Sequence, residues 1–275
     1  MNPHLAKSGS PRALLTSLWE HRSLSYQLAK REVVGRYRGS VAGLAWSFFN
    51  PLLMLAVYTF VFSVIFQARW GGLEAGKGGF AIVLFVGVLV HGVFAECLNR
   101  APTLIMANTN YVKRVMFPLE ILPWVAMGSS LFHAFVSLIV LVAAQLLVMG
   151  SIPPTAALLP LILLPLVLTT MGLAYIFAAV GVYLRDVGQI TVVITTVALF
   201  LSPVFYPVTA LPAEYRLIFM LNPLTFIIEQ AREVMIWGRM PDWSGLALYM
   251  AASLVVAWFG FWTFQKMRRG FADVL

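Results

Sequence analysis

A glycine-rich stretch is the most recognisable candidate for chemistry in this chain. Residues 71–78 read Gly-Gly-Leu-Glu-Ala-Gly-Lys-Gly, with the glycine and lysine spacing of a phosphate-binding P-loop. A P-loop also needs serine or threonine after its lysine to hold magnesium, and Gly78 stands there instead. We therefore predict a flexible loop and no cofactor in this chain. Any ATP and magnesium would have to bind to a different chain.

Four polar side chains lie in otherwise apolar stretches, where their energetic cost makes them functional candidates. They are His91, Glu96, His133 and Gln145. His91 and Glu96 would point about 140° apart on a helix. Glu96 is spaced for a local ion pair with Arg100, and His133 stands alone on its helix. We expect packing, helix–helix hydrogen bonds or a local ion pair here. No Ser–His–Asp, Cys–His or paired-carboxylate site can be assembled, so we predict no catalytic residue and no metal site.

An aromatic stripe, Tyr58, Phe62 and Phe66, recurs at intervals of four residues in the first apolar stretch. Sugar rings stack well on aromatic faces because their C–H faces are apolar, so these residues are candidates for lining a glycan channel. Ordinary helix packing is the other interpretation. Trp70 and Tyr206 are typical of the aromatic belts at membrane surfaces.

The amino-acid composition indicates that most of this chain lies in a lipid bilayer. The 275 residues are 60% hydrophobic and 11% charged, whereas a soluble domain carries about a quarter charged residues. One integral membrane domain accounts for the length, and no soluble catalytic domain fits in the remainder. Cys97, the one cysteine, is expected to pack as a small hydrophobic residue. In so apolar a chain the net charge of +8 indicates orientation in a membrane and no nucleic-acid partner.

Six apolar stretches are long enough to cross a bilayer, which needs about 20 residues per helix. The predicted fold is therefore an all-α integral membrane protein with six transmembrane helices in residues 44–275. The predicted spans are 44–66, 80–98, 121–149, 156–183, 187–206 and 246–264.

The basic residues predict the orientation. With the amino terminus inside, the cytoplasmic side receives 14 of the 19 basic residues and 6 of the 11 acidic ones, so the whole net charge lies there. This asymmetry follows the positive-inside rule and places both termini in the cytoplasm.

Residues 1–43 are expected to form a cytoplasmic amphipathic segment that lies against anionic lipid headgroups. Tyr26, Ala29, Val33 and Tyr37 share one helical face. The basic residues around this face are Lys30, Arg31, Arg36 and Arg38. A plain membrane anchor is the simpler interpretation of the same pattern.

The segment 208–240 carries six charges and is predicted to be re-entrant or interfacial on the outer side. Asn222 suits a helix N-cap, Pro223 the first helical position and Gly238 the end. One face requires burial: Leu224, Ile227, Ile228, Ala231, Val234 and Met235. Three charged side chains on the same helix are expected to require water: Glu229, Arg232 and Glu233.

Four motifs, in order along nearly the whole chain, resemble type-2 ABC exporter permeases for polysaccharides. The first contains Arg36-Tyr37-Arg38 and is a basic entry to span one. The matching segments are 31–46 with 50–52, 108–120, 202–207, and 221–225 with Arg232, Pro241 and Trp243. The glycine-rich loop has no place in the family pattern.

The resemblance implies a half-transporter in the bacterial inner membrane, in which two copies form a channel above two separate ATPase chains. A coupling helix at 108–117 would contact the ATPase, through Asn110, Tyr111, Lys113 and Arg114. The implied cargo is a polysaccharide linked to polyprenyl pyrophosphate, such as O antigen, capsule or teichoic acid. We expect Arg36, Tyr37 and Arg38 to engage the carrier pyrophosphate, since guanidinium groups bind phosphate bidentately.

Three alternatives stay open. A type-2 permease for another cargo, such as a drug or small lipid, is the nearest. An ion-coupled secondary transporter would show inverted repeats and charged midplane residues, and no clear repeat is visible. A membrane enzyme for lipid-linked sugars would need a convergent acidic or histidine site, and none is found.

Overall fold

The computed structural model is a helical bundle with no strand in the part of the chain that it describes. The described residues are 9–66, 76–113, 117–210, 212–220 and 222–275. The α-helices are α1 Pro11–Glu20, α2 Arg22–Tyr37, α3 Trp46–Tyr58, α4 Gly76–Arg100, α5 Thr109–Lys113, α6 Leu122–Met149, α7 Leu159–Tyr183, α8 Val187–Phe200, α9 Ala213–Met220, α10 Pro223–Arg232, α11 Trp243–Met267 and α12 Phe271–Val274. Two π-helical segments, η2 Thr59–Ile65 and η8 Glu233–Trp237, extend α3 and α10. The 3-10 turns are η1 Gly43–Ala45, η3 Ala101–Thr103, η4 Met106–Asn108, η5 Leu119–Ile121, η6 Pro154–Leu158, η7 Val208–Ala210 and η9 Arg268–Gly270. The predicted all-α membrane fold is confirmed.

Five helical segments are long and apolar enough to cross a membrane, judged by length and composition over the described residues. They are Gly43–Phe62, Gly78–Thr103, Leu119–Met149, Pro154–Tyr183 and Trp243–Val274. These match the predicted first, second, third, fourth and sixth spans.

The predicted fifth span, 187–206, is shorter than expected, so the count of six spans is not confirmed. Its helix, α8, has 14 residues and ends at Phe200, a length of about 21 Å against an apolar bilayer core of about 30 Å. Pro203 explains the early end, because proline lacks an N–H and disfavours helical backbone at the preceding Ser202.

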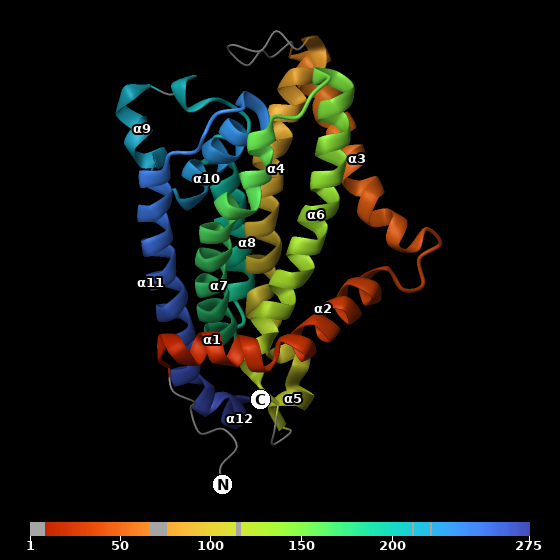
Figure 1. The fold of residues 1–275 in the computed structure, drawn as a ribbon. Helices are drawn as coiled ribbons and strands as arrows, with labels where there is room; N and C mark the ends of the chain where they lie inside the picture. Colours follow the sequence, from red (N-terminus) through yellow and green to blue (C-terminus); the bar gives the residue numbers. More distant parts are fainter. Residues whose placement is uncertain (1–8, 67–75, 114–116, 211, 221) are drawn as a thin grey trace.

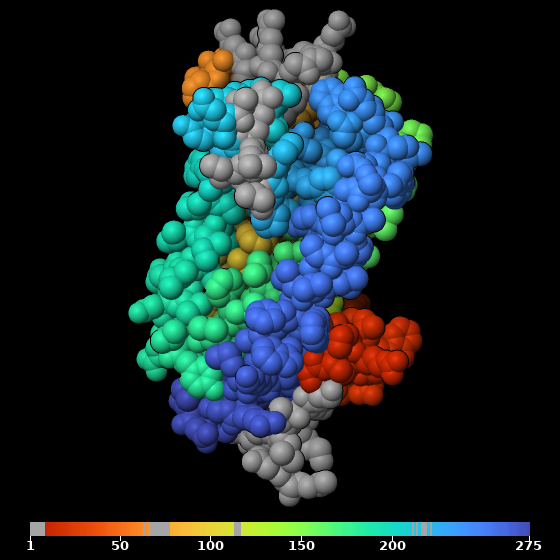
Figure 2. Space-filling view, turned by 90° about the vertical axis from the view of Figure 1, so that its left-hand side faces the viewer, coloured from red at the N-terminus to blue at the C-terminus, as the bar shows by residue number. Residues whose placement is uncertain are grey.

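The two ends of the bundle differ in what covers them (Figure 1). Helices α1, α5 and α12 lie at one end, here called the basal end, and α9 and α10 lie toward the other, the apical end. Helix α1 crosses the foot of α11, as Figure 2 also shows in red against blue. There the indole N–H of Trp258 donates to the carbonyl of Gly9 at 3.1 Å. The amphipathic start of the chain therefore packs on the basal end.

Small residues allow the longest helix contact, between α7 and α11. A Cβ at Gly172 would collide with the carbonyl of Val256, and a Cβ at Gly260 would collide with the carbonyl of Gly172. Such backbone contacts stabilise helix pairs in membranes, where lipid and side chains are equally apolar. Helix α4 runs beside this pair, and its Cys97 is buried as expected.

The predicted caps of the apical segment are confirmed. The Asn222 side chain accepts from the Leu224 N–H at 2.9 Å, Pro223 opens α10, and Gly238 ends η8 with φ of +66°. The predicted apolar face is buried against α4 and α7. This segment thus enters the bundle from the apical end.

The expectation that Arg232 faces water is wrong. Its side chain is 1% exposed, and its N–H groups are held by three carbonyls and by the carboxylate of Glu229 at 2.9 Å. The carbonyls belong to Val83, Pro203 and Val204, at 3.1, 2.5 and 3.0 Å. Gly87 makes room, since a Cβ there would lie 3.1 Å from the guanidinium. Burial lowers the pKa of Arg232 to about 10, which leaves it charged at neutral pH.

Candidate functional site

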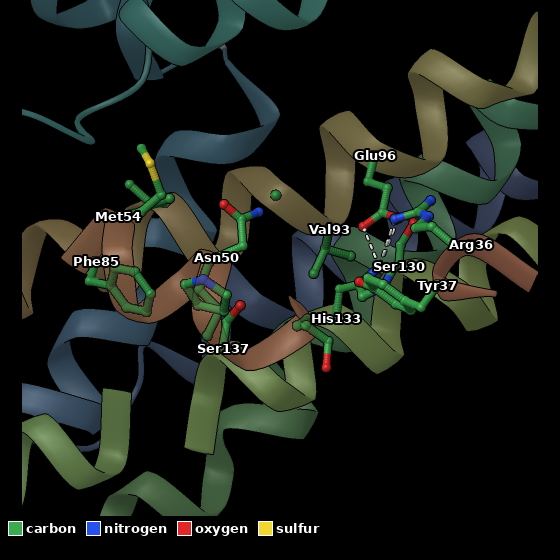
Figure 3. Close-up of a pocket in the computed structure, with 16 residues that line it drawn as sticks. Arg36, Tyr37, Asn50, Met54, Phe85, Val93, Glu96, Ser130, His133 and Ser137 are labelled. Carbon is green, nitrogen blue, oxygen red and sulfur yellow. Dashed lines mark hydrogen bonds and ion pairs between the residues drawn. The ribbon is translucent and has the colours of Figure 1, made fainter. Parts of the chain in front are cut away.

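A cavity of about 230 Å³ lies between the end of α2, α3, α4 and α6 (Figure 3). Its walls combine apolar side chains such as Met54 and Phe85 with polar groups from all four helices. The polar lining residues are Arg36, Tyr37, Ser47, Asn50, Glu96, Ser130, His133 and Ser137. Polar groups within membrane-spanning helices are costly, so this concentration marks a functional candidate.

Four of these residues form one connected group, here called the basal cluster: Arg36, Tyr37, Glu96 and His133. The guanidinium of Arg36 lies 2.7 Å from the Glu96 carboxylate. The His133 Nδ1 lies 2.9 and 3.0 Å from the two oxygens of that carboxylate. The Tyr37 hydroxyl lies 3.0 Å from His133 Nε2. The cluster therefore joins the end of α2 to both α4 and α6.

A carboxylate can only accept hydrogen bonds, so the contacts with Glu96 place a proton on Nδ1 of His133. The other ring nitrogen, Nε2, pairs with the Tyr37 hydroxyl. Burial raises the pKa of Tyr37, which keeps the hydroxyl protonated as a donor. Arg36 and Glu96 carry opposite charges and balance each other. An anion entering the cavity would have to displace the Glu96 carboxylate from the guanidinium of Arg36.

The predicted local pairing of Glu96 with Arg100 is wrong. Arg100 pairs with Glu32 of α2, and Glu96 turns toward Arg36 and His133 instead. His133 is therefore not isolated. Its partners lie on other helices, which spacing within one helix could not reveal.

The expected helix–helix hydrogen bonds are found at the other two intramembrane polar residues. His91 Nε2 lies 2.9 Å from the carbonyl of Thr195 on α8. The Gln145 amide donates to the carbonyl of Met235 at 2.6 Å. Both residues thus have packing partners and lie outside the cavity.

The predicted headgroup residues are split by the structure. Arg36 and Tyr37 point toward the cavity (Figure 3). Arg38 follows the end of α2, is exposed, and has no carboxylate partner among the described residues. Of the two arginines, Arg38 is the one whose charge is not already balanced. Their role in binding a carrier stays a prediction.

The aromatic stripe points mainly inward in this single chain. Phe62 stacks on Phe80 and Phe205, with ring centroids 5.4 and 5.9 Å apart. Tyr58 is half-buried beside the same group, and Phe66 is largely exposed. A channel-lining role for the three stays a prediction.

The predicted coupling segment contains α5 at the basal end. Asn110 is exposed, whereas Tyr111 stacks on Phe117 with centroids 4.1 Å apart and accepts from Arg31 of α2 at 2.8 Å. Arg114 and the side chain of Lys113 lie outside the described residues, as do residues 71–75 of the glycine-rich loop and Trp70. Tyr111 therefore links the coupling segment to α2.

Sequence reasoning missed a buried ion pair at the basal end. Arg268 and Glu120 lie 2.6 Å apart, 6% and 1% exposed. The Tyr175 hydroxyl donates to the Glu120 carbonyl at 2.8 Å, and the Ser17 hydroxyl donates to its carboxylate at 3.4 Å. The pair joins the start of the third span to the end of α11. The one local signal is an acid beside Pro118 at the start of an apolar stretch.

Comparison with known proteins agrees with this architecture. Residues 24–236 match the family described as ABC-2 type transporter. The O-antigen export system permease protein RfbA of Myxococcus xanthus is 28% identical over 263 residues, covering 94% of this chain and 98% of the relative. A Klebsiella pneumoniae protein of the same name is 24% identical, covering 90% and 93%. The Escherichia coli polysialic acid transport protein KpsM is 22% identical, covering 84% and 88%. The resemblance inferred from the motifs is thus confirmed, and the chain belongs to the ABC-2 type transporter family.

Proposed function

We propose that this chain is the channel-forming permease subunit of an ABC exporter that moves a polysaccharide out of a bacterial cell. The similarity to O-antigen and polysialic acid permeases over 84–94% of the chain carries this proposal. In the proposed complex two copies enclose a path through the inner membrane. Two ATPase chains bind at the basal end, which faces the cytoplasm. ATP and magnesium are held by those chains.

The proposed cargo is a glycan, such as O antigen, linked to polyprenyl pyrophosphate. Arg38, exposed at the end of α2, makes the first contact with the pyrophosphate. Arg36 follows by exchanging the Glu96 carboxylate for a phosphate oxygen, while His133 keeps its hydrogen bond to Glu96 and leaves that carboxylate with a partner. Guanidinium groups suit both ligands because carboxylate and phosphate accept the same paired N–H donors.

The coupling route follows from the contacts of α5. Asn110 and Tyr111 sit at the basal end, and Tyr111 is hydrogen-bonded to Arg31 of α2. Movement imposed on α5 by an ATPase would therefore move α2, and with it Arg36 and Tyr37. Cycles of ATP binding and hydrolysis would in this way shift α2 against the bundle and advance the glycan stepwise.

A deletion strain complemented with variants tests this function. Deletion should remove the surface glycan and leave lipid-linked glycan inside the cell, and the wild-type gene should restore export. Arg36→Gln/Arg38→Gln should abolish export at normal membrane abundance, whereas Arg12→Gln, a control at an exposed basal arginine, should export normally. Normal export by the double variant would show that Arg36 and Arg38 are not needed to bind the carrier headgroup.

The second candidate is a type-2 permease for a drug or small lipid, which needs the same ATPase partner. In that case deletion would leave surface glycan unchanged and alter sensitivity to a drug or the distribution of a lipid. The polar cavity favours the glycan, since Asn50 and Ser137 add hydrogen-bonding groups that an apolar drug would leave unpaired.

A further inference from the structure

A second cavity, of about 490 Å³, lies between α2 and the basal half of α6, and the Glu32–Arg100 pair is not part of its lining. It is here called the α2–α6 groove. Its walls are apolar and include a tryptophan, a residue type that prefers the bilayer surface. The large apolar residues of its walls are Leu18, Val33, Val34, Leu44, Trp124 and Phe132.

Two cations border this groove, Arg22 and Lys30, and none of its lining residues is acidic. The Arg22 guanidinium lies 4.5 Å from the Trp19 ring and donates to the Trp19 carbonyl at 2.7 Å, so its position is fixed. Within the described parts of the chain, no carboxylate lies within 4.0 Å of Arg22 or Lys30. The rim therefore offers uncompensated positive charge beside an apolar channel.

One close contact between α2 and α6 lies in the wall of this groove. A Cβ at Gly128 would lie 3.1 Å from the Cβ of Ala29, so glycine lets the two helices touch there. Away from this contact the helices leave space lined by larger side chains. The exposed Tyr26 stands at the same face of α2, and aromatic rings of this kind anchor at the headgroup level.

Two smaller cavities lack this combination. A cavity lined by Ala45, Phe48, Phe49 and Leu52 is apolar without a cation. The smaller cavity that contains Arg31 also contains Glu32. The α2–α6 groove joins an apolar channel to unbalanced positive charge, which is the pattern that complements a lipid with an anionic headgroup.

We propose that the α2–α6 groove binds an anionic phospholipid of the adjacent leaflet, with an acyl chain in the groove and the headgroup phosphate at Arg22 and Lys30. The bound lipid would fix the position of α2 on α6, and so the position of Arg36 at the end of the same helix. This site is separate from the 230 Å³ cavity and does not depend on the identity of the cargo.

Native mass spectrometry of the full-length chain in mild detergent tests the site. Dioleoyl phosphatidylglycerol and dioleoyl phosphatidylcholine serve as probes, because they share acyl chains and differ in charge. Phosphatidylglycerol should remain bound when phosphatidylcholine has dissociated. Arg22→Gln/Lys30→Gln should weaken its binding about 25-fold, or about five-fold for each cation. The matched control, Arg12→Gln/Arg185→Gln, removes two exposed basal cations outside the groove and should bind as wild type.

A second variant separates the groove from general surface charge. Val34→Trp fills the apolar channel and leaves both cations in place, so it too should lose phosphatidylglycerol. Equal retention of the two lipids, or equal binding by the rim and control variants, would overturn the proposal. Displacement of phosphatidylglycerol by polyprenyl phosphate at equal concentration would also overturn it, because the groove would then belong to a carrier lipid.

Discussion

Two arginines, Arg232 toward the apical end and Arg36 at the basal cluster, have their charges balanced inside the bundle by different kinds of group. Arg232, at the apical end, is 1% exposed and held by three backbone carbonyls and one carboxylate. Arg36, at the basal cluster, is 39% exposed and paired with the carboxylate of Glu96, which His133 also contacts. Both charges are neutralised within the protein, but by groups of different mobility.

This difference separates a structural role from a functional one. Backbone carbonyls cannot leave Arg232 without moving the helix and turn that carry them, so Arg232 fixes α10 to α4 and to the turn after α8. Side-chain partners of Arg36 can rotate away, and the neighbouring cavity gives them room. We therefore expect substitutions at the apical site to reduce folding, and substitutions at the basal cluster to reduce export.

Arg232→Met should give the largest effect. It removes the guanidinium donors from three carbonyls and the counter-ion from the Glu229 carboxylate, which should cost about 5 kcal/mol of folding free energy. The measurement is thermal unfolding of the purified chain, with abundance in membranes. Arg239→Met is the control, because Arg239 is 72% exposed and should change little. If the Arg232→Met protein were stable and abundant but exported poorly, Arg232 would serve export and not folding.

The buried Glu120–Arg268 pair tests what makes an ion pair important for folding. The alternatives are its burial and its position at one end of the bundle. It lies at the basal end, yet Glu120→Gln should behave like the Arg232 variant and cost about 3 kcal/mol, since an unpaired buried charge remains. The double variant Glu120→Leu/Arg268→Met should recover most of this loss. Unfolding temperatures of the three proteins check the prediction, which fails if the double variant is less stable than the single one.

How far the sequence predicted these sites depends on the distance between partners. Asn222, Pro223 and Gly238 were predictable because a helix cap involves neighbours in the chain. The Arg232 cage was not, because its carbonyls come from Val83 and from the turn at 203–204, far away in sequence.

For the basal cluster, the sequence indicated which residues were unusual but not how they pair. Glu96 and His133 stood out as costly residues in apolar stretches, but they are 37 residues apart in the chain and lie on different helices. Positions in separate helices carry no spacing signal, so the local Glu96–Arg100 pair was the wrong choice. The shortened α8 is the opposite case, since Pro203 gave a local reason that the apolar run 187–206 obscured.

Glu96→Gln should give a smaller loss of stability with a larger loss of export. The Glu96 side chain is 23% exposed, and partly exposed ion pairs contribute about 1 kcal/mol or less. Export should fall because Arg36 loses the partner that positions it. Surface glycan measured against membrane abundance separates the two effects, with Arg12→Gln as a control outside the cavity. Loss of abundance equal to loss of export would assign the basal cluster a structural role only.

The smallest effect is expected at Asp242, an exposed apical carboxylate that caps α11. Hydrogen bonds from Ser244 and from the Gly245 N–H hold its pKa below the usual range. A depressed pKa means that its contribution to stability is present above the usual value of about 3.9 and is lost as pH falls through the lower folded value. Asp242→Asn should remove this acid dependence and leave neutral-pH stability nearly unchanged. Unfolding temperatures recorded between pH 3 and 7 would show it, and unchanged acid dependence in the variant would rule out this cap as the source.

As the permease half of an ABC exporter, this chain would form a complex with its ATPase. The most direct test is the mass and composition of the complex purified in mild detergent from the native host through a tag on this chain. We predict two copies of the chain with two ATPase chains. If the chain purifies alone, and deletion of the ATPase gene leaves its activity unchanged, it is not an ABC permease.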